Sequence, residues 1–133
     1  MKLLSYDTSS EVLSASIHDG QKLVAELNDA SLGRHSNSLV PSLDRLLKER
    51  RMRLEDIDYL AVGLGPGSFT GLRVGITTAK MLAYASGMKI VGVPSLETIA
   101  CGVLNWEGPI AVLLDARKGK VYAALYEKSD KML

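Results

Sequence analysis

The sequence predicts an α/β fold in which a mixed sheet is flanked by helices, and three observations lead to this prediction. The first 27 residues contain strand patterns, two of which are joined by the hairpin signal Asp19-Gly20. From residue 36 onward, helix and strand patterns alternate, which is typical of parallel strands connected by helices. A glycine-rich turn at residues 65–71 joins an apolar strand pattern to an apolar helix pattern.

Hydrophobic periodicity predicts each element in turn. Leu13, Ala15 and Ile17 alternate with polar residues, as in a strand with one buried face. The helix expected near residue 36 carries an apolar stripe, and Pro41 should lie in its first turn, where the missing N–H does no harm. The expected order is strands over 2–7, 12–18 and 22–27, a helix over 36–50, a strand over 58–64, a helix over 71–86, a strand over 89–93, a helix over 95–104, and strands over 110–114 and 121–126.

This order of elements is shared by ribonuclease-H-like folds and by each half of the actin, sugar-kinase and heat-shock ATPase (ASKHA) fold. Residues 110–126 repeat the opening plan, with an apolar strand ending in Asp115, a short turn and a second strand. We therefore expect an N-terminal actin-like lobe over residues 1–106 and the start of a second, truncated lobe over residues 107–133. Two strands without their helices bury little surface, so we expect the sequence to be part of a longer protein.

Composition is that of a globular protein. The 133 residues are 47% hydrophobic and 23% charged, with a formal net charge of +1, so no basic surface indicates direct binding of nucleic acid. The single cysteine, Cys101, excludes an intramolecular disulfide and has apolar neighbours, which predict a buried thiol in a reducing compartment. Neither a signal peptide nor a run of spanning length is found, so we expect a cytoplasmic protein with no membrane partner.

The most specific segment is the nonapeptide Gly65-Pro66-Gly67-Ser68-Phe69-Thr70-Gly71-Leu72-Arg73. It is not a Walker A loop, because Leu72 and Arg73 stand where Lys-Ser or Lys-Thr would follow the last glycine. It is not a dinucleotide fingerprint either, because Thr70 occupies the position of the third glycine. Two interpretations remain: a tight turn with Thr70 as the helix N-cap, or backbone N–H groups that receive an anion.

The helix after the turn carries small residues at intervals of four, namely Gly71, Gly75, Ala79 and Ala83. Such spacing stacks them on one side, where another backbone can approach closely. The helix packs either on the sheet of its own chain alone or against a second protein chain as well as its own sheet, and the helix over 36–50 would be its companion in an interface. The residues of this predicted interface are Leu39, Leu43, Leu46, Gly71, Leu72, Arg73, Gly75, Ile76, Ala79 and Ala83.

A nucleotide site is predicted at the end of the first strand, where Asp7, Thr8 and Ser9 follow one another. In ATPases of the actin-like fold, an acidic residue at this place positions a hydrated metal ion. The loop nevertheless lacks the glycine that lets a backbone approach phosphate closely, and the corresponding loop near Asp115 has Ala116-Arg117 and no glycine pair.

With these residues in view, the chain resembles the TsaB (YeaZ) family of bacterial tRNA threonylcarbamoyladenosine biosynthesis. The resemblance covers nearly the entire chain, and the block from Gly65 to Arg73 is its most specific part. Supporting segments are Asp7-Thr8-Ser9, His35-Ser36, Leu39-Val40-Pro41, Ala79-Lys80, Val91-Gly92-Val93 and Ser95-Leu96-Glu97. The resemblance implies an actin-like fold and a close relationship to TsaD, the catalytic subunit. It also implies that family members are longer than this chain by most of a second lobe.

The same resemblance bears on metal binding. TsaD has a metal-binding pair of histidines spaced H-x-x-x-H, and the matching residues here are Ser95 and Ile99, neither of which can supply an imidazole. The two histidines of the chain, His18 and His35, are far apart in sequence and belong to no metal motif. We therefore expect no metal, no cofactor and no catalytic residue.

The resemblance implies a non-catalytic partner subunit that dimerises with a TsaD-type subunit and supports transfer of the threonylcarbamoyl group to the tRNA adenosine next to the anticodon. A TsaE-type ATPase would join the assembly, tRNA would be contacted only indirectly, and the chain alone would form a homodimer through the same helices. The alternatives are a nucleotide phosphohydrolase or kinase of the actin-like class acting alone, and a peptidase. No nucleophile elbow supports the peptidase, because Gly67-Ser68-Phe69 lacks the G-x-S-x-G frame.

Overall fold

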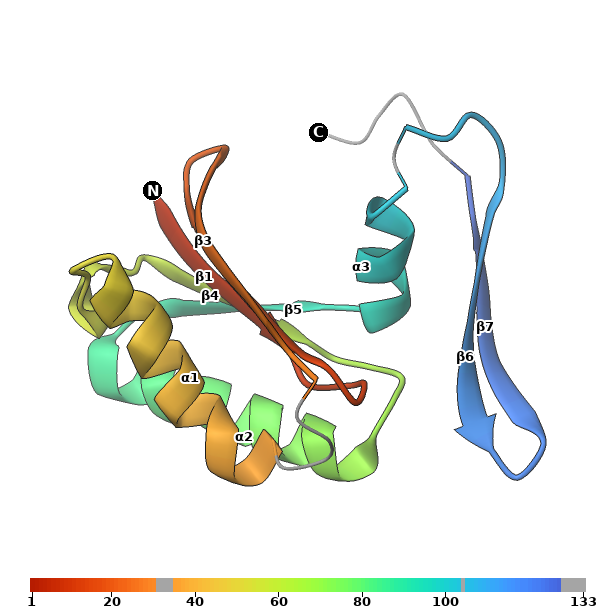
Figure 1. Cartoon of the computed structure of the whole chain (residues 1–133), viewed down its shortest axis with the longest axis horizontal. Helices are drawn as coiled ribbons and strands as arrows, with labels where there is room; N and C mark the ends of the chain where they lie inside the picture. Colours follow the sequence, from red (N-terminus) through yellow and green to blue (C-terminus); the bar gives the residue numbers. More distant parts are fainter. Residues whose placement is uncertain (31–34, 104, 128–133) are drawn as a thin grey trace.

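The central element is a five-stranded sheet with the strand order β3-β2-β1-β4-β5 (Figure 1). The structure is a computed structural model that describes residues 1–30, 35–103 and 105–127. The strands of this sheet are β1 (Lys2–Asp7), β2 (Leu13–Asp19), β3 (Lys22–Asp29), β4 (Tyr59–Gly63) and β5 (Lys89–Val93). The mixed sheet predicted from the order of the elements is confirmed.

The two halves of the sheet differ in direction. Strands β1, β2 and β3 are antiparallel neighbours, whereas β1, β4 and β5 run parallel. The β2–β3 hairpin pairs Asp19 with Lys22, so its two turn residues are Gly20 and Gln21, one position later than predicted. Gly20 has a φ of 58°, which a residue without Cβ adopts at little cost.

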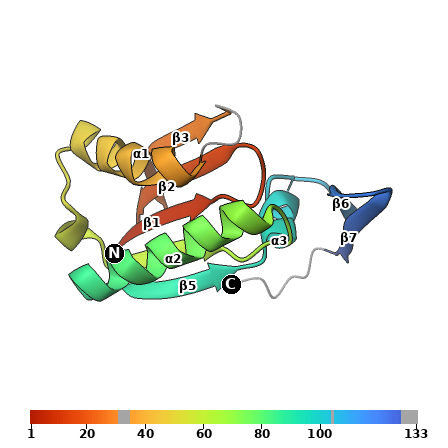
Figure 2. The same ribbon diagram turned by 90° about the horizontal axis from the view of Figure 1, so that it is seen from below.

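Helices α1 (His35–Glu49) and α2 (Phe69–Ser86) cover one face of this sheet (Figure 2). They pack on the buried side of the strands through an apolar core made of Leu4, Tyr6, Leu13, Ala15, Ile17, Ala25, Leu39, Leu43, Leu46, Leu47, Ile57, Leu60, Val62, Ala79 and Met88. The prediction for Pro41 is wrong: α1 begins at His35, which places this proline inside the helix, past the first turn. Its ring is exposed to solvent and therefore displaces no core side chain.

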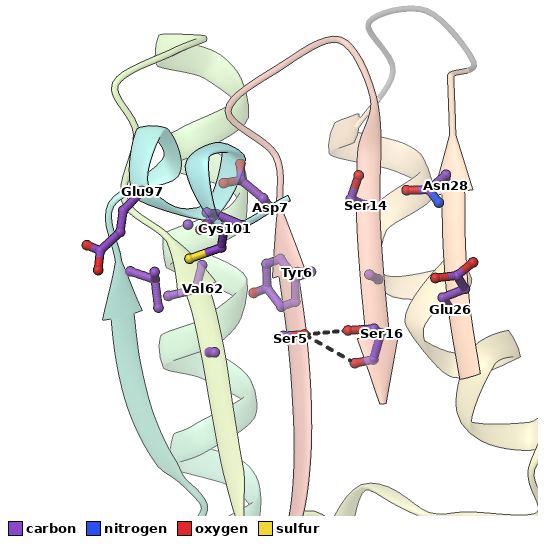
Figure 3. Close-up of a pocket in the computed structure, with 15 residues that line it drawn as sticks. Ser5, Tyr6, Asp7, Ser14, Ser16, Glu26, Asn28, Val62, Glu97 and Cys101 are labelled. Atoms are coloured by element: carbon purple, nitrogen blue, oxygen red, sulfur yellow. Dashed lines mark hydrogen bonds between the residues drawn. The ribbon is translucent and has the colours of Figure 1, made fainter. Parts of the chain in front are cut away.

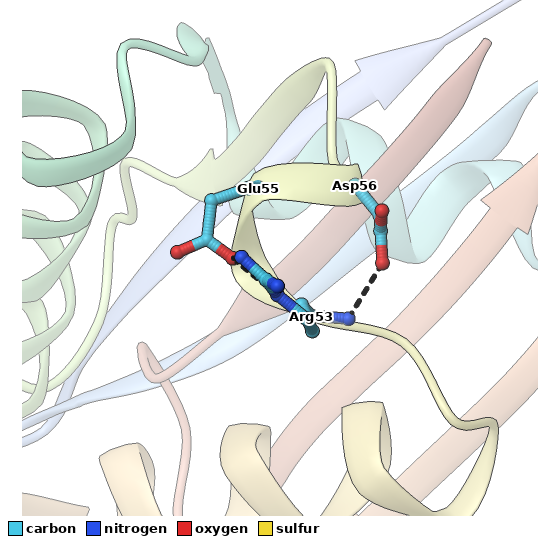
Figure 4. Close-up of polar contacts among 3 residues, drawn as sticks. All are labelled: Arg53, Glu55 and Asp56. Atoms are coloured by element: carbon cyan, nitrogen blue, oxygen red, sulfur yellow. Dashed lines mark hydrogen bonds and ion pairs between the residues drawn. The ribbon is translucent and has the colours of Figure 1, made fainter.

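A short 3-10 helix, η1 (Leu54–Asp56), leads the chain from α1 into β4. The backbone N–H of Arg53 donates to Asp56 Oδ2 at 2.8 Å, and the Arg53 guanidinium donates twice to Glu55 Oε2 at 3.0 Å (Figure 4). A hydrogen bond from its own backbone N–H, followed by the Arg53 side chain, lowers the pKa of the Glu55 carboxyl. The positive charge of Arg53, which follows α1, is thus partly neutralised by the nearby carboxylate of Glu55.

The end of the described chain forms a separate two-stranded sheet from β6 (Ile110–Arg117) and β7 (Lys120–Tyr126). Helix α3 (Ser95–Cys101) lies between the main sheet and this hairpin (Figure 1). Leu96, Ala100 and Val112 form a small second core there, joined by Ile110, Leu114, Ala124 and Tyr126. The hairpin therefore has its own packing partner, while the predicted lobe boundary at residue 107 stays a prediction.

Helix α3 is shorter than the sequence predicts. It ends at Cys101 with Gly102 as its C-cap, whereas residue 104, the predicted end, lies outside the described residues. No helix in the described ranges is long and apolar enough to cross a membrane.

Candidate functional site

Asp7 stands where β1 ends, and both oxygens of its carboxylate accept hydrogen bonds. The backbone N–H of Ser9 donates to Asp7 Oδ1 at 2.6 Å, and the hydroxyl of Ser95 donates to Asp7 Oδ2 at 2.6 Å. The first bond closes a local turn after the strand. The second reaches the first residue of α3. Asp7 therefore holds the loop after β1 and the start of α3 in place.

The glycine turn is held by internal hydrogen bonds. The N–H of Gly65 donates to Ser95 Oγ at 3.0 Å, and the N–H of Ser95 donates back to the Gly65 carbonyl at 2.8 Å. Further along, the N–H of Ser68 donates to the Ser9 carbonyl at 2.6 Å. The Gly65–Pro66 peptide bond is cis. Since these N–H groups already have partners, the structure favours the tight-turn interpretation over an anion site at Gly65 and Ser68.

The N-cap of α2 is Ser68 and not Thr70, which corrects the prediction. Ser68 Oγ accepts from the N–H of Gly71 at 3.2 Å, and the helix begins at Phe69. Thr70 therefore already lies inside the first turn, where its exposed side chain faces solvent. The Ser68 cap thus satisfies one of the backbone N–H groups at the start of α2.

Thr8 and Ser9, two of the three residues predicted for a nucleotide site, are buried and hydrogen-bonded within the chain. Thr8 is fully buried, and its Oγ1 donates to the Gly71 carbonyl on α2 at 2.8 Å. Ser9 is 6% exposed, and its carbonyl accepts a hydrogen bond from the backbone N–H of Ser68. Both residues hold the loop after β1 against α2, and their part in a nucleotide site stays a prediction. For Asp7, which lines an open hollow, the nucleotide role stays a prediction.

Small residues on α2 are explained by contact with the end of β1 and the loop after it in the same chain. A Cβ added at Gly71 would meet the Thr8 carbonyl, and one added at Gly75 would meet Thr8 Oγ1. The phenol of Tyr6 donates to the Gly75 carbonyl at 2.8 Å, and burial raises the pKa of this tyrosine. Ala79 is fully buried in the same layer. Internal packing, one of the two interpretations of the small-residue spacing, is therefore confirmed.

The predicted interface needs correction at the level of residues. Six of its members are buried within this chain and cannot present side chains to a partner: Leu39, Leu43, Leu46, Gly71, Gly75 and Ala79. Leu72, Ile76 and Ala83 are partly buried, the last two against the main core. Only Arg73 of the predicted set is exposed. The periodicity located the packed side of each helix, and a partner would have to contact the other side.

A hollow of about 420 Å³ opens on the sheet face away from α1 and α2 (Figure 3). Strand pairing lines up two polar rows across β1, β2 and β3 on this face, since partners in register point to the same side. One row is Asp7, Ser14 and Asn28, and the other is Ser5, Ser16 and Glu26. The hydroxyls of Ser5 and Ser16 lie 2.7 Å apart and share a hydrogen bond.

Helix α3 supplies the wall of the hollow through Glu97, Thr98 and Cys101, the first and last of which are labelled in Figure 3. Cys101 is half-buried and lines the hollow, which corrects the prediction of a buried thiol. Among the residues that the structure describes, no three acidic, histidine or cysteine side chains are grouped as a metal site would need. The hollow thus offers hydroxyl, amide and carboxylate groups that can form hydrogen bonds.

Sequence reasoning missed the hollow residues Ser5, Glu26, Asn28, Glu97 and Cys101. The alternation of Ser14 and Ser16 with apolar residues in β2 did predict a polar sheet face. The missing information was the register, because only the pairing of β1, β2 and β3 brings the polar positions of three strands into common rows. The contribution of α3 depends on its position above the strand ends, which no local pattern specifies.

The strand order, the acidic residue at the end of β1 and the helices on one face are those of a lobe of the actin-like and ribonuclease-H-like class. A family model described as "TsaD: tRNA N6-adenosine threonylcarbamoyltransferase" matches residues 29–133. The chain therefore belongs to this family, and its resemblance to the TsaB (YeaZ) proteins is confirmed by the following relatives.

The chain is 35% identical over 133 residues to the "tRNA threonylcarbamoyladenosine biosynthesis protein TsaB" of Bacillus subtilis (strain 168), covering 100% of this chain and 58% of the relative. It is 35% identical over 132 residues to the protein of the same name from Escherichia coli (strain K12), covering 98% and 57%. The solved structure of YeaZ from Pseudomonas aeruginosa superposes with a TM-score of 0.86 at 30% identity, over 97% of this chain and 61% of that one. The chain thus spans less than two thirds of each of these proteins.

Proposed function

We propose that this chain is a non-catalytic accessory subunit that pairs with a TsaD-type catalytic subunit during transfer of the threonylcarbamoyl group to the tRNA adenosine next to the anticodon. Support comes from the names of the relatives, which place them in tRNA threonylcarbamoyladenosine biosynthesis. The matched family model, which describes the transferase itself, supports a TsaD-type protein as the partner. Related subunits of one fold can pair through equivalent surfaces.

The observation that carries the proposal is the outer side of α2. Phe69, Met81 and Tyr84 are 75%, 66% and 95% exposed, although large apolar side chains usually avoid water. On the inner side, Gly71 and Gly75 bring the same helix tightly against Thr8, in the loop after β1. Because the inner side is fixed by the fold, the outer side is free to contact a partner.

Helix α1 extends this surface. It packs beside α2, and its outward residue Val40 is 53% exposed. The buried leucines Leu39, Leu43 and Leu46 hold α1 on the sheet and support the surface from within. The interface is thus proposed on the outward residues of both helices, with Arg73 retained from the sequence-based set.

A non-catalytic role is supported by the chemistry at α3. Ser95 and Ile99 stand where the transferase relatives would need two imidazoles, and Ser95 is engaged with Asp7 and Gly65. The hydroxyl of Ser95 thus stabilises the fold of this lobe. In the same proposal the chain self-associates in the absence of its partner, a TsaE-type ATPase joins the assembly, and tRNA contacts this chain only indirectly.

The test is complex formation between the full chain and the TsaD-type subunit from the same genome, measured by size-exclusion chromatography with light scattering and by calorimetry. The double variant Met81→Ala/Tyr84→Ala should weaken the complex by at least about tenfold, because exposed aromatic anchors dominate interface energy. Leu23→Ala/Leu125→Ala is the matched control, since these residues are 47% and 74% exposed outside α2. A wild-type chain that does not bind the TsaD-type subunit would contradict the proposal.

An actin-like nucleotide phosphohydrolase or kinase remains the alternative, because Asp7 lines the hollow at the end of β1. The peptidase considered from the sequence is a weaker alternative, since Gly67-Ser68-Phe69 lacks the G-x-S-x-G frame, although the name of one similar solved structure contains the words "similarity to peptidase YEAZ". ATP turnover by the chain alone that is lost in Asp7→Asn would favour the nucleotide enzyme over the accessory role. Peptide turnover by the chain alone would favour the peptidase.

A further inference from the structure

The outer side of α2 carries a continuous stripe of six exposed residues. They are Thr70, Arg73, Thr77, Lys80, Met81 and Tyr84, and we call them the α2 stripe. Successive members are separated by three or four residues, except for the adjacent pair Lys80 and Met81. All six therefore lie on one side of the helix. The stripe runs over nearly the full length of α2, which spans Phe69–Ser86.

Two cations, Arg73 and Lys80, lie seven residues apart on this stripe, about 10.5 Å along the helix axis. The sequence of α2 contains no aspartate or glutamate. Within the described ranges, neither cation forms a salt bridge, and Arg73 instead lies 5.5 Å from the centre of the Phe69 ring. The stripe therefore combines exposed apolar area with two positive charges that no acid of the described chain neutralises.

The neighbouring helix does not supply the missing acids. In the described part of α1, the acidic residues are Asp44 and Glu49. Asp44 already accepts from Lys48 Nζ at 2.7 Å, and no described salt bridge joins Glu49 to either cation of the stripe. A partner that binds the α2 stripe would therefore face two positive charges that have no ion-pair partner in the described part of this chain.

The charges distinguish a second copy of the chain from a different partner. In a two-fold dimer whose antiparallel α2 helices cross at Thr77, Arg73 of one copy approaches Lys80 of the other. Like charges brought together in an interface oppose association, whereas a helix with carboxylates at the same spacing would form two ion pairs.

We propose that the α2 stripe is specific for a helical surface that is apolar and carries two carboxylates about two turns apart, and that Arg73 and Lys80 favour such a heterologous partner over a second copy of this chain. The proposal rests on the accessory role proposed above and specifies the chemistry of the partner. Threonines 70 and 77 lie beside the two cations and can donate hydrogen bonds to the same carboxylates.

The first experiment measures the affinity of the full chain for the TsaD-type subunit at low and high salt. The charge-reversed variant Arg73→Glu/Lys80→Glu should lose roughly tenfold or more in affinity, and the wild-type affinity should fall as salt rises. The matched control is Lys22→Glu/Lys120→Glu, which makes the same change in net charge at two exposed lysines outside α2. Because all four positions are exposed, circular dichroism should be unchanged in both variants.

The outcomes separate the two proposals. If the wild type binds but neither salt nor charge reversal at the stripe changes the affinity beyond the control, the electrostatic inference is overturned and the accessory role stands. If the wild type does not bind the TsaD-type subunit at all, the accessory role is overturned.

A second measurement tests the stripe without any partner. Lys80→Glu alone would place Arg73 of one copy opposite Glu at position 80 of the other, so sedimentation should show a homodimer several-fold tighter than the wild type. Arg73→Glu/Lys80→Glu should show no such gain alone, but should pair with the wild type. Equal self-association of the wild type, the single variant and the double variant would overturn the inference, whatever the result with the TsaD-type subunit.

Discussion

The hydroxyl of Ser95 donates to Asp7 Oδ2 at 2.6 Å, although the two residues are 88 positions apart in the sequence. The same hydroxyl oxygen accepts the N–H of Gly65 at 3.0 Å. One side chain thus joins the end of β1, the glycine turn and the start of α3. It links the lobe formed by the main sheet to the helix on which the β6–β7 hairpin packs.

Replacing Ser95 by alanine should destabilise the fold by about 2 kcal/mol, because the Asp7 oxygen and the Gly65 N–H would both lose a hydrogen-bond partner. Ser95 is 1% exposed, so water cannot easily replace it. Urea denaturation measures the change in the free energy of unfolding. Thr98→Ala is the control, since its hydroxyl donates to the Pro94 carbonyl at an exposed position. Equal losses in the two variants would contradict this role for Ser95.

Gly75→Ala should cost about 1–3 kcal/mol, because the new methyl group would press on Thr8 Oγ1 and overpack the contact between α2 and the loop after β1. In Thr8→Ala the hydrogen bond to the Gly71 carbonyl is lost, but the atom that would clash is also removed. The double variant should therefore be destabilised by less than the sum of the single variants, a coupling that a double-mutant cycle by urea denaturation measures. If the losses in the free energy of unfolding of the two single variants were strictly additive, the contact with Thr8 Oγ1 would not be what restricts the side chain at position 75.

Tyr6→Phe should lower the free energy of unfolding by about 1 kcal/mol at neutral pH through loss of the hydrogen bond to the Gly75 carbonyl. Burial raises the pKa of Tyr6 in the folded chain above the value of about 10 for an unfolded tyrosine. Above pH 10 the unfolded chain therefore releases the Tyr6 proton first, and the stability contributed by this residue falls as pH rises.

The wild type should accordingly lose its advantage over Tyr6→Phe between about pH 9 and pH 11, a window set by the unfolded pKa. Denaturation curves of both proteins at several alkaline pH values test this. A constant difference across the window would show that the phenol ionises equally well in the folded and unfolded chains.

Leu96→Ala should loosen the β6–β7 hairpin and leave the main sheet intact. Leu96 is 6% exposed and packs with Val112 in the second core, which has no buried residue in common with the main core. Hydrogen exchange followed by mass spectrometry should show faster exchange in residues 110–126, with little change in β1 and β4. Ile99→Ala, at a 47% exposed position of the same helix, is the control. Faster exchange throughout the chain would argue against a separate unit that begins near residue 107.

Most of the fold could be predicted from local patterns. Alternation in β2, the apolar stripe of α1 and the small residues at intervals of four in α2 each reflect one buried face, and burial of one face is what imposes a period on a sequence. The same patterns also marked residues such as Leu43 and Gly75 correctly as packed. Their additional assignment to a partner stays a prediction, because periodicity reports that a side is covered and does not report which chain covers it.

The sequence by itself determined the order of the elements, the glycine turn and the family, because these depend on residues close together in the chain. Only the tertiary structure decided what Asp7, Thr8 and Ser95 do, since their partners lie 63 to 88 residues away and hydrogen bonds over such separations leave no local pattern. The polar rows of the hollow were decided by strand register for the same reason. The exposed stripe of α2 became visible once the opposite side of the helix was seen to be packed against Thr8 and the main sheet of the same chain.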